Sequence, residues 1–462
     1  MERPAPADVP ADVLRILHAL WSNGHAAYLV GGGVRDSLLG RAVTDWDIAT
    51  DALPEQTMSL FPGGQYTNRF GTVTVPTTAP SDPVGVEVTT FRRDHRYADH
   101  RRPDSVTFTD SLEEDLARRD FTVNAIAWGR PAGESTEQQW VDPTAGLADL
   151  EAGVLRAVGD AKVRFDEDGL RLLRAARLAA QLKFDIEPAT LEAMTSTSDT
   201  ARWVSSERVG GELRKMVAAD PPSKAFSILA DTGVLEHALP ELAAQRGVPQ
   251  DKVTGDDLWG HSMATVDGAA TVDPSNRTLR LTALLHDIGK PPTFADGHFI
   301  GHDEEGAKMA EALLTRLAYP RHEVVNVSAL IANHMFSFEP RWSGAAVRRF
   351  IRRVGRELID DLIKLRRADN IGSGLPPEAG HLDELASRVN AELDARSPLN
   401  LRELAVDGDD LINGLGLKPG PAVGELLERL LGSVIADPAR NTREQLLGEA
   451  RAWAARGEAA AE

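Results

Sequence analysis

The pattern of apolar and polar positions changes once along the chain, near residue 150. Before that point, short apolar or alternating runs predict strands at 26–30, 45–50, 71–77 and 84–91. Helical periodicity at 8–24 and 34–40 predicts two helices, and three consecutive glycines at 31–33 predict a turn. The N-terminal part is therefore expected to form a small mixed sheet with helices.

Helical periodicity dominates from about residue 150 to the end of the chain. The Arg/Leu/Ala-rich segment at 166–183 is strongly helical in its pattern, and polar, turn-rich stretches at 244–257 and 371–380 predict boundaries. We therefore expect the α+β class. The expected regions are a mixed-sheet head at 1–150, a helical neck at 151–243, a helical body at 250–375 and a helical tail at 376–462.

Composition narrows the function classes. The chain has no cysteine, which excludes disulfides, thiolate metal sites and a cysteine nucleophile. No uninterrupted apolar stretch approaches the roughly 18 residues that a membrane span needs. The acidic, proline-rich N-terminal stretch does not resemble a signal peptide, so a cytoplasmic location is expected.

The net charge of −19 argues, taken alone, against a nucleic-acid partner. Its distribution is uneven, because residues 341–367 carry nine Lys/Arg against three Asp/Glu, and residues 91–102 are also locally basic. The first cluster fits either a basic track for a phosphate backbone or an ordinary solvated helix face. Both interpretations stay open at the level of sequence.

The segment 29–50 carries the first chemical signal. Asp45 and Asp47 are two residues apart on a predicted strand, so both carboxylates are expected on one face. Such a pair can bridge two Mg²⁺ ions about 3.5–4 Å apart, which suits phosphoryl chemistry. The glycine run upstream allows close approach of a phosphate, and Arg35 adds positive charge. The run matches neither the phosphate-loop motif nor the dinucleotide-binding motif.

This segment resembles the head motif GGxVRDxLLGR…DxD of the class II tRNA nucleotidyltransferases and bacterial poly(A) polymerases. Its sequence is LVGGGVRDSLLGRAVTDWDIAT. The resemblance implies a polymerase-β-like nucleotidyltransferase head, with Asp45 and Asp47 as the metal-binding catalytic pair. It also implies that Gly32 and Arg35 contact the incoming triphosphate. Glu87 is either a third carboxylate on a neighbouring strand or an exposed strand residue. The charged segment 91–102 also resembles the family and suits a mobile loop that guides the substrate.

A second match is RRDFTVNAIAW at 118–128. Arg119 can bind phosphate in a fork, and Asp120 and Asn124 can address sugar hydroxyls. By resemblance this is the ribose-recognition motif of the family. The alternative is a cluster of salt bridges that caps a helix.

The expected neck helix carries FDEDGLRLLRAARLAAQL. Asp168 and Arg171 are three residues apart and would share a helix face, where a carboxylate acceptor and a guanidinium donor can imitate the pairing edge of a base. The pair matches the EDxxR motif of the family, which implies that Glu167 orients it. Arg174 lies one turn further and could reach a phosphate. Outside this context the pair would be read as a surface salt bridge.

A further series in the helical body consists of His261, His286, Asp287 and Asp369. Imidazoles and carboxylates from separate helices can converge on a divalent cation, and the order resembles an HD-domain metal site. His302 and His334 are additional candidates. Some members of the family carry this domain with phosphohydrolase activity. The alternatives are structural histidines or a scaffold that holds tRNA.

Taken together, these motifs predict addition of CCA to the 3′ end of tRNA from CTP and ATP, with Mg²⁺ in the head and a second divalent metal in the helical body. A poly(A) polymerase and a CC- or A-adding enzyme remain alternatives that use the same head. The C-terminal part has no arginine-rich tail, which favours tRNA as the partner. An alternative from another class of enzyme is an HD-domain phosphohydrolase with a degenerate head.

Overall fold

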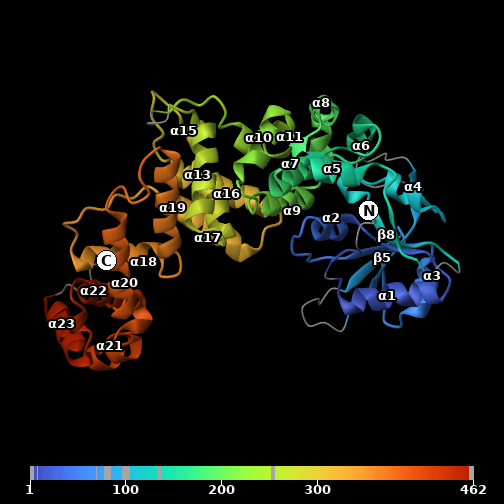
Figure 1. Cartoon of the computed structure of the whole chain (residues 1–462). Coiled ribbons are helices and arrows are strands. Elements are labelled where there is room, and N and C mark those ends of the chain that lie inside the picture. Colours follow the sequence, from blue (N-terminus) through green and yellow to red (C-terminus); the bar gives the residue numbers. More distant parts are fainter. Residues whose placement is uncertain are drawn as a thin grey trace. The chain divides into compact units, whose positions relative to one another are not determined.

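The computed structural model describes residues 5–7, 9–68, 70–77, 85–95, 105–133, 137–250 and 255–456. It divides into two compact units, residues 1–243 and 244–462. The strands named in the described part of the chain all lie in the first unit, and the second unit is built from helices (Figure 1). The α+β class expected from the sequence is confirmed.

Among the described residues, the main sheet of the head has seven strands in the order β3-β4-β5-β2-β1-β8-β9. The strands are β1 (Ala27–Val30), β2 (Asp47–Thr50), β3 (Gln65–Asn68), β4 (Thr72–Val75), β5 (Val86–Thr90), β8 (Ala127–Arg130) and β9 (Gln139–Val141). β2 pairs with β1 antiparallel and with β5 parallel, and the other neighbours pair antiparallel. The sheet is therefore mixed, as its alternating segments predict.

Strict alternation along the strands divides the head into two cores. Leu29 and Ile48 pack on the face covered by helix α1 (Ala11–Ser22) and helix α3 (Pro54–Leu60). Tyr28 and Ala49 point to the opposite face, where helix α4 (Leu112–Ala117) packs. Asp47 shares the second face with Ala49, because side chains two residues apart on a strand leave the same side.

The glycine run does not form the expected open turn. Gly31 follows β1 with a φ of +76° and begins helix α2 (Gly31–Leu38), so the glycines make its first turn. A Cβ at Gly31 would lie 3.0 Å from Asp47 Oδ2, in addition to the strain of the left-handed backbone. Glycine at this position therefore lets the helix start directly beside the carboxylate.

The helical character expected at 166–183 is confirmed, but the placing of Asp168 within a helix was wrong, because the helix is interrupted there. The chain forms helix α6 (Ala161–Glu167) and helix α7 (Leu170–Leu182), with Asp168 between them in an extended conformation. Asp168 Oδ1 accepts a hydrogen bond from the backbone N of Leu170 at 3.1 Å, and its carbonyl oxygen accepts from Arg171 N at 2.9 Å. Asp168 thus caps the second helix, a role in which Asp is favoured over continued helix.

The rest of the first unit contains two small strand pairs and a series of helices. Its remaining elements are a two-stranded ribbon, β6 (Arg92–His95) with β7 (Ser105–Phe108), and a short pair, β10 (Val154–Leu155) with β11 (Asp185–Ile186). The helices are η1 (Thr122–Asn124), α5 (Gly146–Ala152), α8 (Pro188–Ser196), η2 (Ser198–Trp203), α9 (Ser206–Met216), α10 (Ser223–Asp231), α11 (Val234–Ala238) and α12 (Pro240–Ala243). Of the expected mobile segment 91–102, residues 96–102 lie outside the described residues, as do residues 1–4 and 8 of the N-terminal stretch.

The second unit contains α13 (Leu258–Val272), α14 (Arg277–Leu285), α15 (Lys290–Thr293), α16 (His302–Arg316), α17 (Arg321–Asn333), α18 (Gly344–Val354), α19 (Ile359–Gly372) and α20 (Leu382–Asp394). After these come η3 (Leu401–Glu403), α21 (Gly408–Leu415), α22 (Pro421–Ala436), η4 (Pro438–Arg440) and α23 (Arg443–Ala455). None of the described helices combines the length and the apolar character that crossing a membrane requires.

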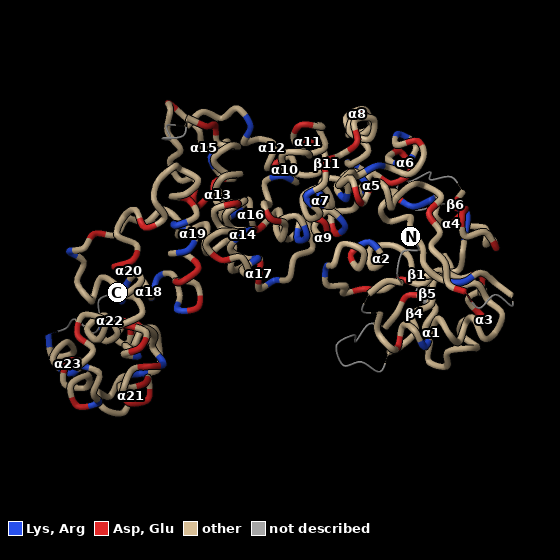
Figure 2. Tube along the Cα trace, in the orientation of Figure 1, with Lys and Arg blue, Asp and Glu red and all other residues tan. Residues whose placement is uncertain are grey.

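The basic cluster at 341–367 is largely matched by acidic residues from outside the cluster. Basic and acidic residues are interspersed in this part of the chain (Figure 2). Arg348 pairs with Glu392 at 2.7 Å, and Arg352 pairs with Glu428 at 2.6 Å. Arg356–Glu403, Lys364–Asp273 and Arg367–Asp383 are further pairs, at 2.9, 2.9 and 2.7 Å. Much of the local excess of positive charge therefore holds neighbouring elements together.

Candidate active sites

Two carboxylates of the head face each other across the parallel pair of strands β2 and β5. Asp47 and Glu87 are register partners in this pair, so their side chains leave the same face of the sheet. Glu87 therefore lies on the strand next to Asp47, where a third metal-binding carboxylate would have to be.

Asp45 does not occupy the expected strand position. The strand begins at Asp47, and Asp45 lies in the preceding irregular segment with its side chain exposed. The expectation that both aspartates share one strand face was therefore wrong in its geometry. The carboxylate of Asp45 still lies close enough to raise the pKa of both Asp47 and Glu87.

Burial and mutual repulsion raise the pKa values of these acids. Burial is the main cause that lifts the pKa of Asp47 to about 6, and the charges of Asp45 and Glu87 add to it, while Arg119 opposes the shift. Burial also raises the pKa of Glu87, with Asp45 as the second cause. Three acids that repel one another, of which Asp45 and Glu87 have exposed side chains, fit the binding of a cation, which would offset their charge.

Arginines surround this group of carboxylates. A cavity of about 210 Å³ is lined by Asp47, Glu87, Arg92, Arg118 and Arg119, together with Val30, Ile48, Thr72 and Thr89. Arg119 donates to Asp115 at 3.3 Å and lies near the Asp47 carboxylate. Acids for a metal and guanidinium groups for phosphate therefore line one cavity.

A chain of hydrogen bonds connects the glycine motif to the ribose motif and the neck. Arg35 donates to Asn124 Oδ1 at 2.6 Å, and Asn124 donates to Asp120 at 3.0 Å. Asp120 also pairs with Arg174 of α7 at 2.6 Å. Although burial favours the neutral acid, Arg174 and Asn124 hold the pKa of Asp120 well below its usual range. Four of the predicted nucleotide-binding residues thus form one connected group.

Asp168 does not lie on the helix that carries Arg171, so the prediction that the two residues share a helix face was wrong. Asp168 lies before α7 and binds Arg208 of α9 through both carboxylate oxygens, at 3.1 and 2.6 Å. Arg171 pairs instead with Glu167 at 2.6 Å and donates to the carbonyl oxygen of Arg118 at 3.1 Å. Sequence reasoning missed Arg208, whose only signal was its place in SSERVGGELRKM.

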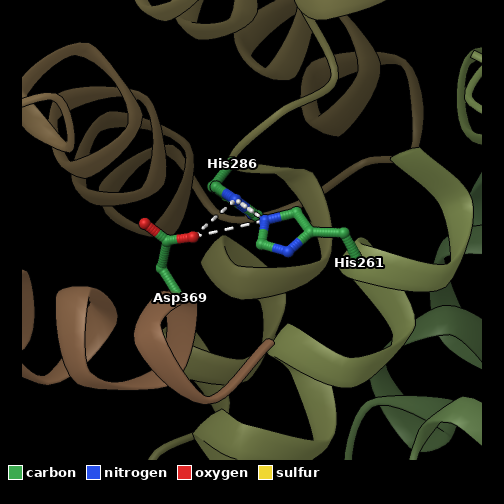
Figure 3. Close-up of side chains that lie close together, drawn as sticks. All are labelled: His261, His286 and Asp369. Atoms are coloured by element: carbon green, nitrogen blue, oxygen red, sulfur yellow. Dashed lines mark hydrogen bonds and ion pairs between the residues drawn. The ribbon is translucent and has the colours of Figure 1, made fainter. Parts of the chain in front are cut away.

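A second group of ligands lies in the helical unit. His261 comes from α13, Asp369 from α19, and His286 directly follows α14. Figure 3 shows the three side chains pointing toward one another. His261 Nε2 is 3.2 Å from both His286 Nε2 and Asp369 Oδ1, while His286 Nε2 is 3.9 Å from Asp369 Oδ1. The predicted H…HD…D series is thus brought together.

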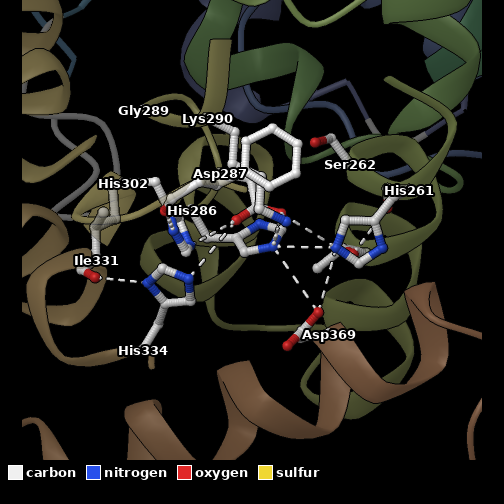
Figure 4. Close-up of polar contacts among 12 residues, drawn as sticks. His261, Ser262, His286, Asp287, Gly289, Lys290, His302, Ile331, His334 and Asp369 are labelled. Carbon is white, nitrogen blue, oxygen red and sulfur yellow. Dashed lines mark hydrogen bonds and ion pairs between the residues drawn. The ribbon is translucent and has the colours of Figure 1, made fainter. Parts of the chain in front are cut away.

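Asp287 lies beside this group together with His302 and His334, the additional candidates from the sequence (Figure 4). Nδ1 of His286, His302 and His334 each lies 2.7–2.8 Å from a backbone carbonyl oxygen three residues earlier. A hydrogen on Nδ1 that donates to this carbonyl leaves the Nε2 lone pair for a metal, which is the usual outer-shell arrangement of histidine ligands. These contacts favour the tautomer that can bind a cation.

The pKa shifts of the histidines and of Asp287 are also consistent with binding of a divalent cation. Burial lowers the pKa of His286 and of His302, so both imidazoles are neutral near pH 7. Burial alone would raise the pKa of Asp287, but the surrounding histidines hold it well below its usual value. The site combines imidazoles with carboxylates, which is a ligand set for a divalent transition metal.

The cavity at this second site holds basic and apolar groups that the sequence did not reveal. It measures about 390 Å³ and includes Lys290 and Arg366 together with Phe299, Ile300 and Met335. Lys290 Nζ is 2.6 Å from Asp287 Oδ2. Lys290 follows the histidine–aspartate pair by only a few residues, whereas Arg366 had no sequence signal beyond the basic cluster.

A mixed-sheet head with clustered acids and arginines, joined to a helical neck, defines a nucleotidyltransferase. Family models match the Poly A polymerase head domain at residues 27–156, the probable RNA and SrmB-binding site of polymerase A at 183–246, and the HD domain at 258–373.

Similar proteins cover nearly the whole chain. The CCA-adding enzyme of Geobacillus thermodenitrificans is 33% identical over 94% of this chain and 94% of its own length. That of Geobacillus kaustophilus is 34% identical over 94% of both. The crystal structure of the Bacillus stearothermophilus CCA-adding enzyme in complex with CTP is 29% identical, with a TM-score of 0.67 over 97% of this chain and 98% of that one. The chain belongs to the CCA-adding enzyme family.

Proposed function

We propose that the chain adds CCA to the 3′ end of tRNA, with CTP and ATP as substrates. The observation that carries the proposal is one connected group of residues, in which Arg35, Asn124, Asp120 and Arg174 join the glycine helix, the ribose motif and the neck. The similar enzyme of Bacillus stearothermophilus was crystallised with CTP, which supports a cytidine nucleotide as substrate. A cytoplasmic location accords with tRNA as the partner.

In the head, Asp45 and Asp47 would hold Mg²⁺, and Glu87 would complete the set. Their mutual repulsion and the raised pKa of Asp47 fit such a cation. When bound, two divalent ions activate the attacking hydroxyl and stabilise the leaving pyrophosphate. In the reaction, the 3′ oxygen of the RNA bonds to the α-phosphorus, the bond to pyrophosphate breaks, and the hydroxyl proton is released.

The remaining head residues would position the nucleotide. Gly32 at the start of α2 and Arg119 in the acidic cavity would bind the triphosphate. Asp120, kept ionised by Arg174, would accept a hydrogen bond from a ribose hydroxyl. Arg35 holds Asn124 in place, so these two residues would act together.

Base selection would depend on Asp168 and Arg171. A carboxylate accepts hydrogen bonds and a guanidinium donates them, so together they can address the pairing edges of cytosine and adenine. Arg171 reaches the carbonyl of Arg118 in the ribose motif, which supports a location next to the nucleotide. Since Asp168 is bound to Arg208, base reading would require either a shared or a released Asp168–Arg208 contact.

The test supplies purified protein with a tRNA that lacks CCA, with Mg²⁺ and with CTP, ATP or both, and reads product length on a gel. Two additions with CTP and a third only with ATP present are expected. Long tails from ATP alone would identify a poly(A) polymerase, and a stop after two C, or addition of A only to tRNA ending in CC, would identify a partial enzyme. No extension would contradict the proposal.

A second activity is supported by the ligand group of the helical unit. Its histidines and carboxylates suit a divalent metal, and Lys290 and Arg366 line the same cavity. We propose metal-dependent hydrolysis of phosphate esters here, in which a water oxygen bonds to phosphorus and the ester alcohol leaves with a proton. Hydrolysis of bis-p-nitrophenyl phosphate with Mn²⁺ tests it, and no metal-dependent turnover above a chelated control would refute it.

The proposed activities can be assigned to the four regions expected from the sequence. The head (1–150) and neck (151–243) would carry nucleotide addition, and the region at 250–375 would carry the metal-dependent site. The tail (376–462) would bind the tRNA body.

A further inference from the structure

Asp115 is a buried carboxylate that lies behind the arginines of the head cavity. It belongs to helix α4, and only 1% of its side chain is exposed. Its partners Arg118 and Arg119 both line the cavity that also contains Asp47 and Glu87. Aspartate is almost never fully buried unless it is paired, so the partners of Asp115 indicate what its charge does.

The two oxygens of Asp115 have different partners. Oδ1 accepts two hydrogen bonds from Arg118, at 3.0 and 2.6 Å, and lies 3.4 Å from the backbone N of Arg92. Oδ2 accepts a hydrogen bond from Nη2 of Arg119 at 3.3 Å. Although burial favours the neutral acid, Arg118 and Arg119 hold the pKa of Asp115 below its usual value. The carboxylate is therefore ionised, with Oδ1 fixed by Arg118 and Oδ2 available to Arg119.

The guanidinium of Arg119 is only partly engaged by the protein. Its Nη2 donates to Asp115, whereas its buried Nε has no hydrogen-bond partner among the described residues. Its Nη1 lies near Asp47, because a Cβ at Gly31 would be 3.3 Å from Nη1 and 3.0 Å from Asp47 Oδ2. A buried donor without a partner costs free energy, so Arg119 has donor capacity left for an anion at this place.

Two carboxylates compete for this one guanidinium. An ion pair between Arg119 and Asp47 would neutralise the acid proposed to bind Mg²⁺ and would occupy the donor proposed to bind the triphosphate. Asp115 offers Arg119 a second carboxylate that no cation needs. Any rotation of this carboxylate toward Asp47 would break its hydrogen bonds to Arg118, so Asp115 can hold Arg119 in one place.

We propose that Asp115 is a positioning residue for nucleotide binding. It restrains Arg119, so that the arginine binds the triphosphate and Asp47 stays free for the cation. Asp115 is too deeply buried to touch the nucleotide, and it therefore acts through Arg119. This role rests on the nucleotide addition proposed above.

The experiment measures two quantities with the full chain and Mg²⁺: the Kd for CTP by calorimetry, and the KM for CTP during extension of tRNA that lacks CCA. Asp115→Asn removes the charge of the acid. Both constants are expected to rise by about 10- to 100-fold, which corresponds to the loss of a charge-assisted hydrogen bond. The Mg²⁺ concentration for half-maximal extension should also rise, because Arg119 is then free to pair with Asp47. Asp115→Glu keeps the charge but displaces it, and should raise the Kd by less.

A double variant tests whether Asp115 acts through Arg119. In the Arg119→Ala background, Asp115→Asn should change the Kd for CTP by less than about twofold, because two residues that act through one interaction have non-additive effects. Asp51→Asn is the matched control, since it makes the same substitution at another acid of the head. The partners of Asp51, which are His25 and the backbone N of Ala26, do not line the cavity, so this variant should retain the parent Kd.

An unchanged Kd for CTP in folded Asp115→Asn would overturn the proposal, as would an equal effect of this substitution with and without Arg119. If melting curves show that Asp115→Asn does not fold, the same comparison is made with Asp115→Glu, whose weaker CTP binding should disappear in the Arg119→Ala background. Weaker CTP binding in Asp115→Asn, combined with no extension of tRNA by the parent protein, would refute nucleotide addition and leave the role of Asp115 in nucleotide binding standing.

Discussion

Arg208 donates hydrogen bonds to both carboxylate oxygens of Asp168, at 3.1 and 2.6 Å, although the two residues lie 40 positions apart in the sequence. Such fork-shaped, charge-assisted contacts fix geometry as well as charge. Asp168 also caps α7, so the same carboxylate is held by its own helix and by α9. The residue proposed to read the base is thus positioned by a partner that is distant in the sequence.

We predict that Arg208→Ala weakens discrimination between CTP and ATP. Loss of charged hydrogen bonds costs about 1.5–3 kcal/mol, or roughly 10- to 100-fold, so the ratio of kcat/KM for the correct and wrong nucleotide should fall by up to that factor. Arg208→Lys keeps the charge without the fork and should give an intermediate ratio. Arg202→Ala removes an exposed neck arginine paired with Asp199 and should change nothing. Unchanged selectivity in Arg208→Ala would remove this role.

Asp45→Ala and Asp47→Ala are each predicted to abolish nucleotide addition while leaving tRNA binding largely intact. Loss of metal-supplied charge stabilisation costs several kcal/mol, so kcat should fall by roughly 1,000-fold or more. Single-turnover extension of tRNA and a filter-binding assay separate the two effects. Glu55→Gln, at an exposed acid on α3, is the control. Turnover near that of the parent enzyme in either variant would contradict the assignment.

The raised pKa of Asp47 predicts a pH-dependent stability. Because the pKa is about 6 in the folded chain against 3.8 for the ordinary group, folding without metal is penalised once the pH rises through that interval. In a chelator, Asp47→Asn should therefore be more stable than the parent at pH 7.5, by about 1–3 kcal/mol. The difference should shrink as the pH falls and vanish only well below 3.8, where the acid is neutral in both the folded and the unfolded chain. Urea unfolding across this range measures it, and a constant difference would show that the acid is not responsible.

The alternating strands were predictable because one side of each strand is buried, which leaves a period of two in the sequence. The same logic correctly placed Glu87 on the strand next to Asp47. It failed for Asp45, because a strand boundary depends on pairing with neighbours that a single segment does not reveal. Asp45 nevertheless lies near Asp47, as predicted, because only one residue separates the two aspartates in the sequence.

The neck shows a different limit. Periodicity favoured one helix over 166–183, yet the hydrogen bonds of Asp168 to the backbone end one helix and begin another. An Asp side chain can bond to nearby backbone N–H groups in place of continuing a helix. At Asp168 the extended conformation is also held by Arg208 from α9. Long-range partners such as Arg208 and Arg366 have no local pattern, whereas the histidines of the second site were found from their order alone.

The last prediction separates the two sites. His286→Ala removes an imidazole that belongs to the helical unit, whereas the acids proposed for nucleotide addition all lie in the first unit. The rate of CCA addition should therefore stay within about twofold of that of the parent. Metal-dependent hydrolysis of bis-p-nitrophenyl phosphate should fall at least about 100-fold, because loss of a ligand weakens metal binding. His322→Ala controls for loss of an exposed histidine, and a melting curve confirms folding, because His286 is fully buried. Loss of nucleotide addition in a folded His286→Ala protein would mean that the two sites act as one.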